Sequence, residues 1–180
     1  MPITSQEIIE KLNPELKKFL VLSGTEILEI SIDTNNYIHN NGERSIGIIF
    51  KIEEEGRLLK IIAPYLYIIN KRNNTSVKNL YQTLLQICWQ TKLVQFEYDN
   101  ENGEIRAVIE TAVEDGTLTK GQINRMIETL LRVIEQYHTE IDAFVSGRND
   151  YISSSPSDEL IARYNKVFNT RNDQKLNSRI

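Results

Sequence analysis

The chain has 180 residues, of which 40% are hydrophobic and 26% charged, and its formal net charge is −4. This hydrophobic content is too high for a wholly disordered protein, and no apolar run approaches the roughly 20 residues that a membrane span needs. Cys88 is the single cysteine, which excludes an internal disulfide and a zinc site built from several cysteines. With no signal peptide visible, we expect a soluble, cytoplasmic, globular protein with no membrane partner.

The first predicted element is a helix. Thr4 and Glu7 form a Thr-x-x-Glu capping box, and apolar residues then recur at helical spacing as far as Leu20. Pro14 conflicts with one continuous helix, because proline removes a backbone amide and clashes with the preceding turn. Two alternatives stay open: a break at Asn13-Pro14 with a second short helix running to Leu20, or one kinked helix.

Three strands are predicted next, because the hydrophobic period changes to two. Residues 28–32 alternate between apolar and polar side chains, and residues 46–52 and 58–62 form a hairpin with a clear register. Pro64 interrupts this pattern. We therefore interpret residues 65–69 either as another edge strand or as the approach to a helix.

A helix, a second hairpin and a long helix follow. Residues 76–92 are predicted to be helical, and residues 94–98 and 105–111 alternate as two strands. Thr119 then opens another capping box, and a continuous apolar stripe predicts a helix over residues 120–146, about 40 Å long. The inner face of the helix at 76–92 is expected to carry Val77, Leu80, Tyr81, Leu84 and Cys88.

The composition changes after Gly147. The serine-rich stretch at 153–157 is typical of a linker, and residues 158–169 match a short helix. Residues 1–146 carry 15 basic and 21 acidic side chains, whereas residues 147–180 carry six and four. We therefore predict a domain over residues 1–146 and a polar C-terminal extension over residues 147–180.

No motif points to catalysis. The sequence has no glycine-rich phosphate loop, no HExxH helix and no GxSxG elbow. The segment from Asp99 to Gly103 fails as a calcium loop, because an EF-hand needs glycine at position six and Gly103 falls at position five. We predict that the protein is not an enzyme and has no cofactor and no metal site.

Two polar residues on the long helix are candidates for a site that binds a small ligand or catalyses a reaction. His138 and Asp142 lie one helical turn apart and could hold a metal ion or move a proton, but no third ligand is evident. A pair of exposed helix side chains is therefore favoured over a site. The alternative function is a small-ligand binder, or an enzyme whose site assembles from distant residues, with this pair and the acidic second hairpin as first candidates. Cys88 has no basic neighbour that would activate its thiol and is interpreted as structural.

The second hairpin and its exit are strongly acidic, with Arg106 as the single basic residue. Such a strip repels nucleic-acid phosphates, so we expect no nucleic-acid partner. It could attract a basic segment of a partner, although a solvated acidic face is the commoner meaning of such a run. The acidic residues of this strip are Glu97, Asp99, Glu101, Glu104, Glu110, Glu114 and Asp115.

The second predicted hairpin and the residues that follow it resemble those of a known protein family. Phe96-Glu-Tyr-Asp99, the turn glycine Gly103, and Glu114 to Thr119 before the long helix resemble the YbjN-like family over residues 1–146, in particular uncharacterised cyanobacterial members. That family is similar in fold to type III secretion chaperones. The resemblance implies an α+β fold in the order α-β-β-β-α-β-β-α, with helices packed on an antiparallel sheet. It transfers no functional residue, because the matching positions are turns and caps.

Protein interaction is the function that these observations predict. The resemblance implies a regulatory or chaperone-like module, since the chaperone relatives are acidic dimers that bind extended segments of other proteins. We expect a non-enzymatic protein that binds a protein partner and forms a homodimer. The expected contact surfaces are the long helix and any open sheet edge, where strand addition could capture a partner. The candidate partner-binding residues are Tyr137, Ile141, Phe144 and Trp89.

Overall fold

The computed structural model describes residues 2–16, 19–21, 27–39, 41–69, 74–114 and 116–146. The chain divides into two compact units, Met1–Arg148 and Asn149–Ile180. All described residues belong to the first unit. The short helix predicted at 158–169 lies outside the described residues.

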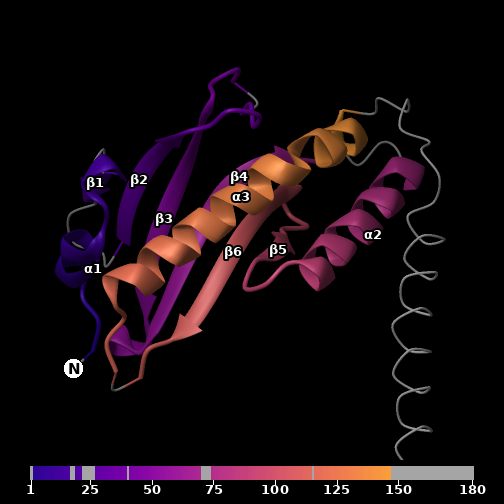
Figure 1. The fold of residues 1–180 in the computed structure, drawn as a ribbon. Coiled ribbons are helices and arrows are strands. Elements are labelled where there is room, and N and C mark those ends of the chain that lie inside the picture. Colours follow the sequence, from indigo (N-terminus) through magenta and orange to yellow (C-terminus); the bar gives the residue numbers. More distant parts are fainter. Residues whose placement is uncertain are drawn as a thin grey trace, which may run out of the picture. The chain divides into compact units, whose positions relative to one another are not determined.

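The first unit is α+β and combines an antiparallel sheet with helices, which confirms the predicted fold class (Figure 1). The described part contains a six-stranded sheet in the order β1-β2-β3-β4-β6-β5. The helices are α1 (Ser5–Lys11), α2 (Asn74–Gln90) and α3 (Lys120–Val145), with short 3-10 helices at η1 (Pro14–Leu16) and η2 (Glu54–Gly56). The strands are β1 (Phe19–Val21), β2 (Ile27–Asp33), β3 (Ser45–Glu53), β4 (Leu58–Ile68), β5 (Gln95–Tyr98) and β6 (Glu104–Ala112).

The chain breaks at Pro14, as one of the two alternatives predicts. The capping box of Thr4 and Glu7 forms, α1 ends at Lys11, and Pro14 begins η1, where its missing amide would have no helical partner. The second helix does not reach Leu20, however. Residues 19–21 form β1 and pair with residues 28–30 of β2, so a ladder formed with a distant strand overrides the local helical spacing.

Pro64 does not end β4, although proline lacks the amide that a ladder needs. The pairing of β4 with β6 shifts between Ala63 and Tyr67, and this bulge contains Pro64. Within the bulge, Tyr65 has a φ of 52° and donates its backbone N–H to a carboxylate oxygen of Glu104, at 3.1 Å. The predicted strand at 58–62 and the alternative strand at 65–69 are therefore one strand, because a side chain replaces the interrupted ladder.

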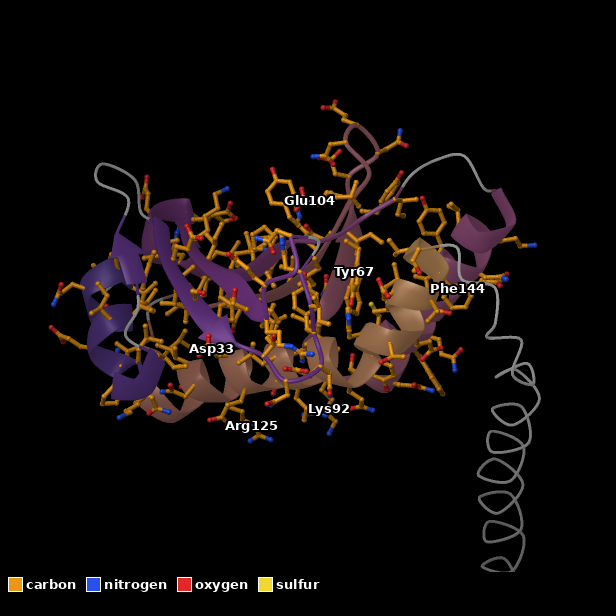
Figure 2. The ribbon with its side chains drawn as sticks, turned by 90° about the horizontal axis from the view of Figure 1, so that it is seen from above. Asp33, Tyr67, Lys92, Glu104, Arg125 and Phe144 are labelled. Atoms are coloured by element: carbon orange, nitrogen blue, oxygen red, sulfur yellow. The ribbon has the colours of Figure 1, made fainter. Side chains whose placement is uncertain are left out.

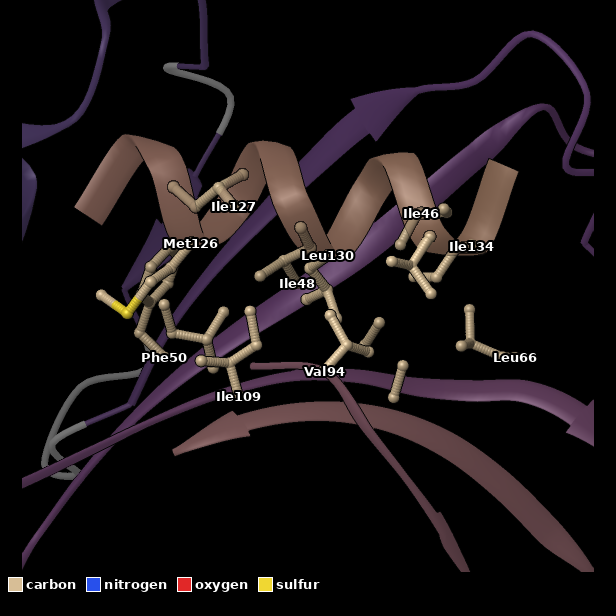
Figure 3. Close-up of a cluster of buried hydrophobic side chains, with 14 of the residues drawn as sticks. Ile46, Ile48, Phe50, Leu66, Val94, Ile109, Met126, Ile127, Leu130 and Ile134 are labelled. Atoms are coloured by element: carbon tan, nitrogen blue, oxygen red, sulfur yellow. The ribbon is translucent and has the colours of Figure 1, made fainter. Parts of the chain in front are cut away.

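The helices share one face of the sheet, and the core lies between this face and α3 (Figures 1 and 3). Alternate residues of β2, β3, β4 and β6 point to the helices and are fully or almost fully buried. From α3, the core receives Ile123, Met126, Ile127, Leu130, Val133, Ile134 and Ile141. The apolar stripe predicted for the long helix is thus used mainly to cover the sheet.

The second helix lies beside α3, over β5. Leu80, Leu84 and Ile87 of α2 are buried, whereas the predicted inner residues Val77, Tyr81 and Cys88 are half-buried. The rings of Tyr81 and Tyr98 are 5.3 Å apart, which fixes α2 against β5. Because α2 and α3 pack together, residues that are 30 to 50 positions apart in sequence line a common surface.

Candidate functional site

The second helix carries apolar side chains on its outer face as well as on its inner one. Leu85 and Trp89 are 71% and 66% exposed, and Leu93, in the turn after the helix, is 55% exposed. Residues four apart lie on the same face of a helix, so Leu85 and Trp89 are neighbours. We call these three residues the α2 stripe. Single exposed apolar side chains are ordinary, but large ones gathered in one place are typical of interaction surfaces.

A groove with a volume of about 500 Å³ lies between the end of α2 and α3, and Leu93 of the α2 stripe is one of its lining residues. The hydroxyl of Tyr137 donates to Oε1 of Gln90 at 3.3 Å and so links the two helices there. Lys92 and Arg125 point to the same side of the molecule (Figure 2). The groove is lined by Gln90, Thr91, Lys92, Leu93, Arg125, Thr129, Arg132, Gln136 and Tyr137.

The charged side chains that line the groove are basic. Among the described residues, Lys92, Arg125 and Arg132 line it, and no acidic residue does. Within the part of the chain that the structure describes, none of these three cations forms an ion pair. Nearby like charges repel one another, so an arrangement of this kind favours an anionic ligand.

In contrast to the groove, two cations on the open face of the sheet, which is the face opposite the helices, form ion pairs with glutamates. Lys60 Nζ lies 3.1 Å from Glu97 and 2.6 Å from Glu110, and Arg106 Nε lies 2.8 Å from Glu97. Burial alone would lower the pKa of Lys60, but its hydrogen bonds to both glutamates raise it above the ordinary value. Burial likewise opposes ionisation of Glu97, and the hydrogen bonds from Lys60 and Arg106 outweigh it and lower the pKa of Glu97.

This pairing changes the interpretation of the acidic hairpin. Glu97 and Glu110 are neutralised by Lys60 and Arg106, and Glu104 is buried and accepts the Tyr65 amide. These three of the seven acidic side chains of this strip therefore have partners within the fold. We do not propose this strip as a site for a basic partner.

The sequence predicts that His138 and Asp142 form a pair of exposed helix side chains. For His138 this prediction is wrong, because the side chain is buried. This histidine is 8% exposed, and its Nδ1 lies 3.0 Å from the hydroxyl of Tyr67. Its ring stacks on Tyr67 and meets the edge of Tyr37, whose own hydroxyl donates to the Leu66 carbonyl. Burial raises the pKa of both tyrosines. Helical spacing suggests solvent for position 138, but the end of β4 and the loop at Tyr37 cover it.

The other side chains that could take part in catalysis or metal binding form hydrogen bonds within the fold. Cys88 is half-buried, and its sulfur accepts the backbone N–H of Phe96 at 3.4 Å. His39, the second histidine of the sequence, accepts the Asn41 amide on its Nδ1 at 3.4 Å within its own loop. Asp99 accepts the amide of Glu101 at 2.8 Å, as a side chain in a hairpin turn does. Among the described residues, no group of three or more His, Cys, Asp or Glu side chains could hold a metal ion.

The four residues predicted to bind a partner take three different positions. Trp89 lies on the exposed α2 stripe, and Tyr137 is half-buried at the groove. Phe144 is half-buried and packs against the core. Ile141 is fully buried, so we withdraw it from the candidate surface. The other three stay predictions.

Sequence reasoning missed Leu85, Leu93 and the three cations of the groove. A signal for Leu85 exists, because it stands four residues before Trp89 and outside the inner apolar spacing of α2. No local pattern reveals the groove, since it exists only where α2 packs beside α3.

The sheet edges are less suited to a partner than the helices. Within the described part of the chain, the two edge strands, β1 and β5, have three and four residues. Short edge strands offer few ladder hydrogen bonds and are a common protection against pairing with another chain. We therefore place the candidate surface on α2 and not on a sheet edge.

A separate finding concerns membranes. Over the residues that the structure covers, helices of the length and apolar character needed to cross a membrane do not occur.

Comparisons with known proteins give little beyond this geometry. No family model matches the chain, and no curated protein matches it. Among solved structures, the chain is similar to a chain of the heterodimeric complex ExoU-SpcU from the type III secretion system of Pseudomonas aeruginosa. The identity is 13% and the TM-score 0.40, and the match covers 64% of this chain and 82% of that chain. A likeness at this level assigns neither a family nor a function.

Proposed function

We propose that this chain is a non-enzymatic protein-interaction module of the cytoplasm, which binds a protein partner through the α2 stripe. The observation that supports this proposal is the exposure of Leu85, Trp89 and Leu93 within nine residues of one another. Full burial of one large apolar side chain stabilises a complex by about 1.5–3 kcal/mol. Tryptophan is also enriched among the residues that dominate binding energy, so Trp89 is the natural anchor.

A regulatory or chaperone-like role is part of the same proposal. It follows the resemblance to the YbjN-like family, which rests on the segment from Phe96 to Asp99, on Gly103 and on the residues before α3. The α2 stripe supports only the more general statement that a protein partner binds.

The sequence also predicts a homodimer, in which a second copy of this chain would compete with a different protein for this surface. The apolar side chains of α3 that would form a dimer contact are largely committed to the core, with Ile141 and Ile134 fully or almost fully buried. We therefore propose a different protein as the partner. Sedimentation of the purified chain over a wide concentration range tests this choice, because a second copy on the α2 stripe would produce a dimer.

The proposal is tested by site-specific cross-linking in the native cell. A photoreactive residue replaces Leu85, and the control carries it at Ser31, which is exposed on the open face of the sheet. We expect position 85 to give a cross-linked partner, identified by mass spectrometry, that position 31 does not give. The partner is then purified for a binding measurement.

The binding measurement compares the native chain with a Leu85→Ser, Trp89→Ser double variant. We expect the dissociation constant to rise at least about tenfold, which corresponds to about 1.4 kcal/mol. The thermal unfolding midpoint should stay unchanged, because both side chains are exposed. Equal affinity of the two proteins for the identified partner would contradict the proposed function.

A further inference from the structure

We propose that the groove between α2 and α3 binds an acidic segment of the protein partner. In this arrangement, carboxylates of the segment meet Lys92, Arg125 and Arg132, and apolar side chains next to them contact the α2 stripe. The inference rests on the proposed function and adds the chemistry of the partner. The partner segment is rich in Asp and Glu, with interspersed large apolar residues.

The charge distribution is the first argument. The chain as a whole is acidic, at −4, yet the described residues that line this groove include three cations and no acid. Glu128 lies between Arg125 and Arg132 in sequence, but it does not line the groove and forms no ion pair with either arginine in the described structure. The three cations repel one another until an anion arrives, and guanidinium groups bind carboxylates through paired hydrogen bonds.

The spacing on α3 is the second argument. Arg125, Thr129, Arg132 and Gln136 are separated by four, three and four residues, so they follow one face of the helix. Seven residues separate the two arginines, which is about 10 Å along the helix axis. An occupant that satisfies all three cations therefore carries several negative charges over a comparable length. Thr91, Thr129 and Gln136 supply further hydrogen-bonding groups.

The neighbouring apolar surface distinguishes a protein segment from other anions. Leu93, which lines the groove itself, is one of the three exposed side chains of the α2 stripe. A free phosphate or a nucleic-acid backbone offers nothing apolar to cover these side chains. Nucleic acid would also approach a chain whose net charge is negative, which opposes binding. An acidic segment with apolar side chains matches both parts of the surface.

The experiment uses the full chain and a synthetic fluorescent peptide of about 12 residues, in which Asp and Glu alternate with Leu and Phe. A matched peptide carries Asn and Gln in place of the acids. Binding is measured by fluorescence anisotropy and by the emission of Trp89, which is the single tryptophan of the chain. We expect the acidic peptide to bind at least about tenfold more tightly than the amide peptide. Its affinity should fall as salt is added, because salt screens exposed charges.

Two double variants locate the binding. Arg125→Gln with Arg132→Gln removes two cations from the groove, whereas Lys78→Gln with Lys120→Gln removes two exposed cations from α2 and α3 that do not line it. Both variants have the same net charge. We expect the groove variant to lose at least about tenfold in affinity for the acidic peptide and the control to lose less than about twofold. Should the groove variant fold poorly, Lys92→Gln, in the turn after α2, tests the same cluster.

Several outcomes would overturn the inference. Equal losses in the two double variants would show attraction by net charge alone, and an unchanged groove variant would exclude the groove. Tighter binding of inorganic phosphate or of a 12-nucleotide single strand than of the peptide would assign the groove to another anion, including the small-ligand alternative. Self-association that disappears in the groove variant would assign it to a second copy.

The two proposals fail separately. If the Leu85→Ser, Trp89→Ser variant loses the identified partner while the groove variant retains it, the proposed function stands and the acidic segment does not. If the stripe variant retains that partner, the proposed function itself fails.

Discussion

The side chain of Asn124 connects α3 to the C-terminal end of α1. Its Nδ2 donates to the carbonyls of Lys11 and Lys120, at 2.9 and 2.7 Å, and its Oδ1 accepts the amide of Asn13 at 3.1 Å. A helix end leaves its last carbonyls without helical partners. Asn124, which is buried, supplies a partner for the end of α1 from a residue of α3.

Replacing Asn124 by leucine should therefore destabilise the domain. The change leaves the Lys11 carbonyl and the Asn13 amide without this partner in a partly buried place. Each buried polar group that loses its hydrogen bond costs about 1–3 kcal/mol. Because these two groups are only partly buried, we expect a loss near the lower end of their sum, about 2–3 kcal/mol in the free energy of unfolding. Urea denaturation measures it. Asn79→Leu, at an exposed position of α2, is the control, and a similar loss there would contradict the interpretation.

At the scale of single residues, the sequence predicts what is local. The capping boxes at Thr4 and Thr119 form as expected, because each joins residues three positions apart. The role of Asn124 could not be predicted, since its partners on the α1 side lie more than 100 positions away. The burial of His138 escaped prediction for the same reason, because its partner Tyr67 belongs to another element.

Among the elements, α3 holds the loop between β2 and β3 through one carboxylate. Glu135 accepts the backbone amides of Asn35 and Asn36, both at 2.6 Å, and that of Tyr37 at 3.1 Å. Hydrogen bonds to a charged group contribute more than neutral ones. This contact positions Tyr37, which is fully buried against Tyr67 and His138.

Glu135→Gln should loosen this loop without unfolding the domain. The neutral amide accepts fewer and weaker hydrogen bonds, and a charged hydrogen bond contributes about 1.5–3 kcal/mol. We expect the amides of Asn35, Asn36 and Tyr37 to exchange with solvent at least about tenfold faster, since 1.4 kcal/mol is a factor of ten. Hydrogen-exchange mass spectrometry measures this. Glu128→Gln, exposed on the same helix, should change nothing in the loop, and an unchanged rate in Glu135→Gln would contradict the role.

The ion pairs on the open face of the sheet predict a dependence of stability on pH. Folding lowers the pKa of Glu97 below its ordinary value of 4.5. Its contribution to stability is therefore complete above pH 4.5 and is lost as the pH falls through the folded-state pKa. We expect Glu97→Gln to cost about 1 kcal/mol at neutral pH, a modest value because the pair is partly exposed, and nothing in strong acid.

The measurement is urea denaturation of the native chain and of Glu97→Gln at neutral pH and near pH 3. Glu101→Gln is the matched control, because Glu101 is exposed in the same hairpin and forms no ion pair in the described structure. A difference between the native chain and Glu97→Gln that stays constant over this range would contradict the assignment.

Most of the helices and strands could be predicted from the sequence. The hydrophobic periods give α1, α2, α3 and five of the strands, because one face of each element is buried and the other is not. The failures occur where pairing overrides local preference. β1 forms where helical spacing continues, and β4 passes Pro64 because Glu104 accepts the Tyr65 amide.

On the scale of the whole molecule, the first unit contains its own core. The buried hydrophobic cluster runs from Ile3 to Ile141 in sequence. A chain that ends at Arg148, the boundary of this unit, should therefore fold with its stability changed by less than about 0.5 kcal/mol. Urea denaturation of the truncated and full chains tests this, and a loss above about 2 kcal/mol would show that residues 149–180 contribute to the fold.

The candidate surface was the least predictable feature of the molecule. The sequence singles out Trp89 and Tyr137, which lie at the α2 stripe and the groove, but it also selects Ile141, which is in the core. A single apolar stripe cannot be divided between core and surface without knowing which element covers it. The groove depends on two helices from different parts of the chain, so neither its cations nor its position follows from local spacing.

The place of α3 in the chain has a consequence for synthesis on the ribosome. This helix, the last described element, covers the apolar face that β2, β3, β4 and β6 present. Until α3 has been synthesised, the strands already made lack the cover that this helix provides, and the Lys11 carbonyl lacks its partner Asn124. The apolar face of the nascent sheet is thus open to aggregation until the last described element of the domain has been made.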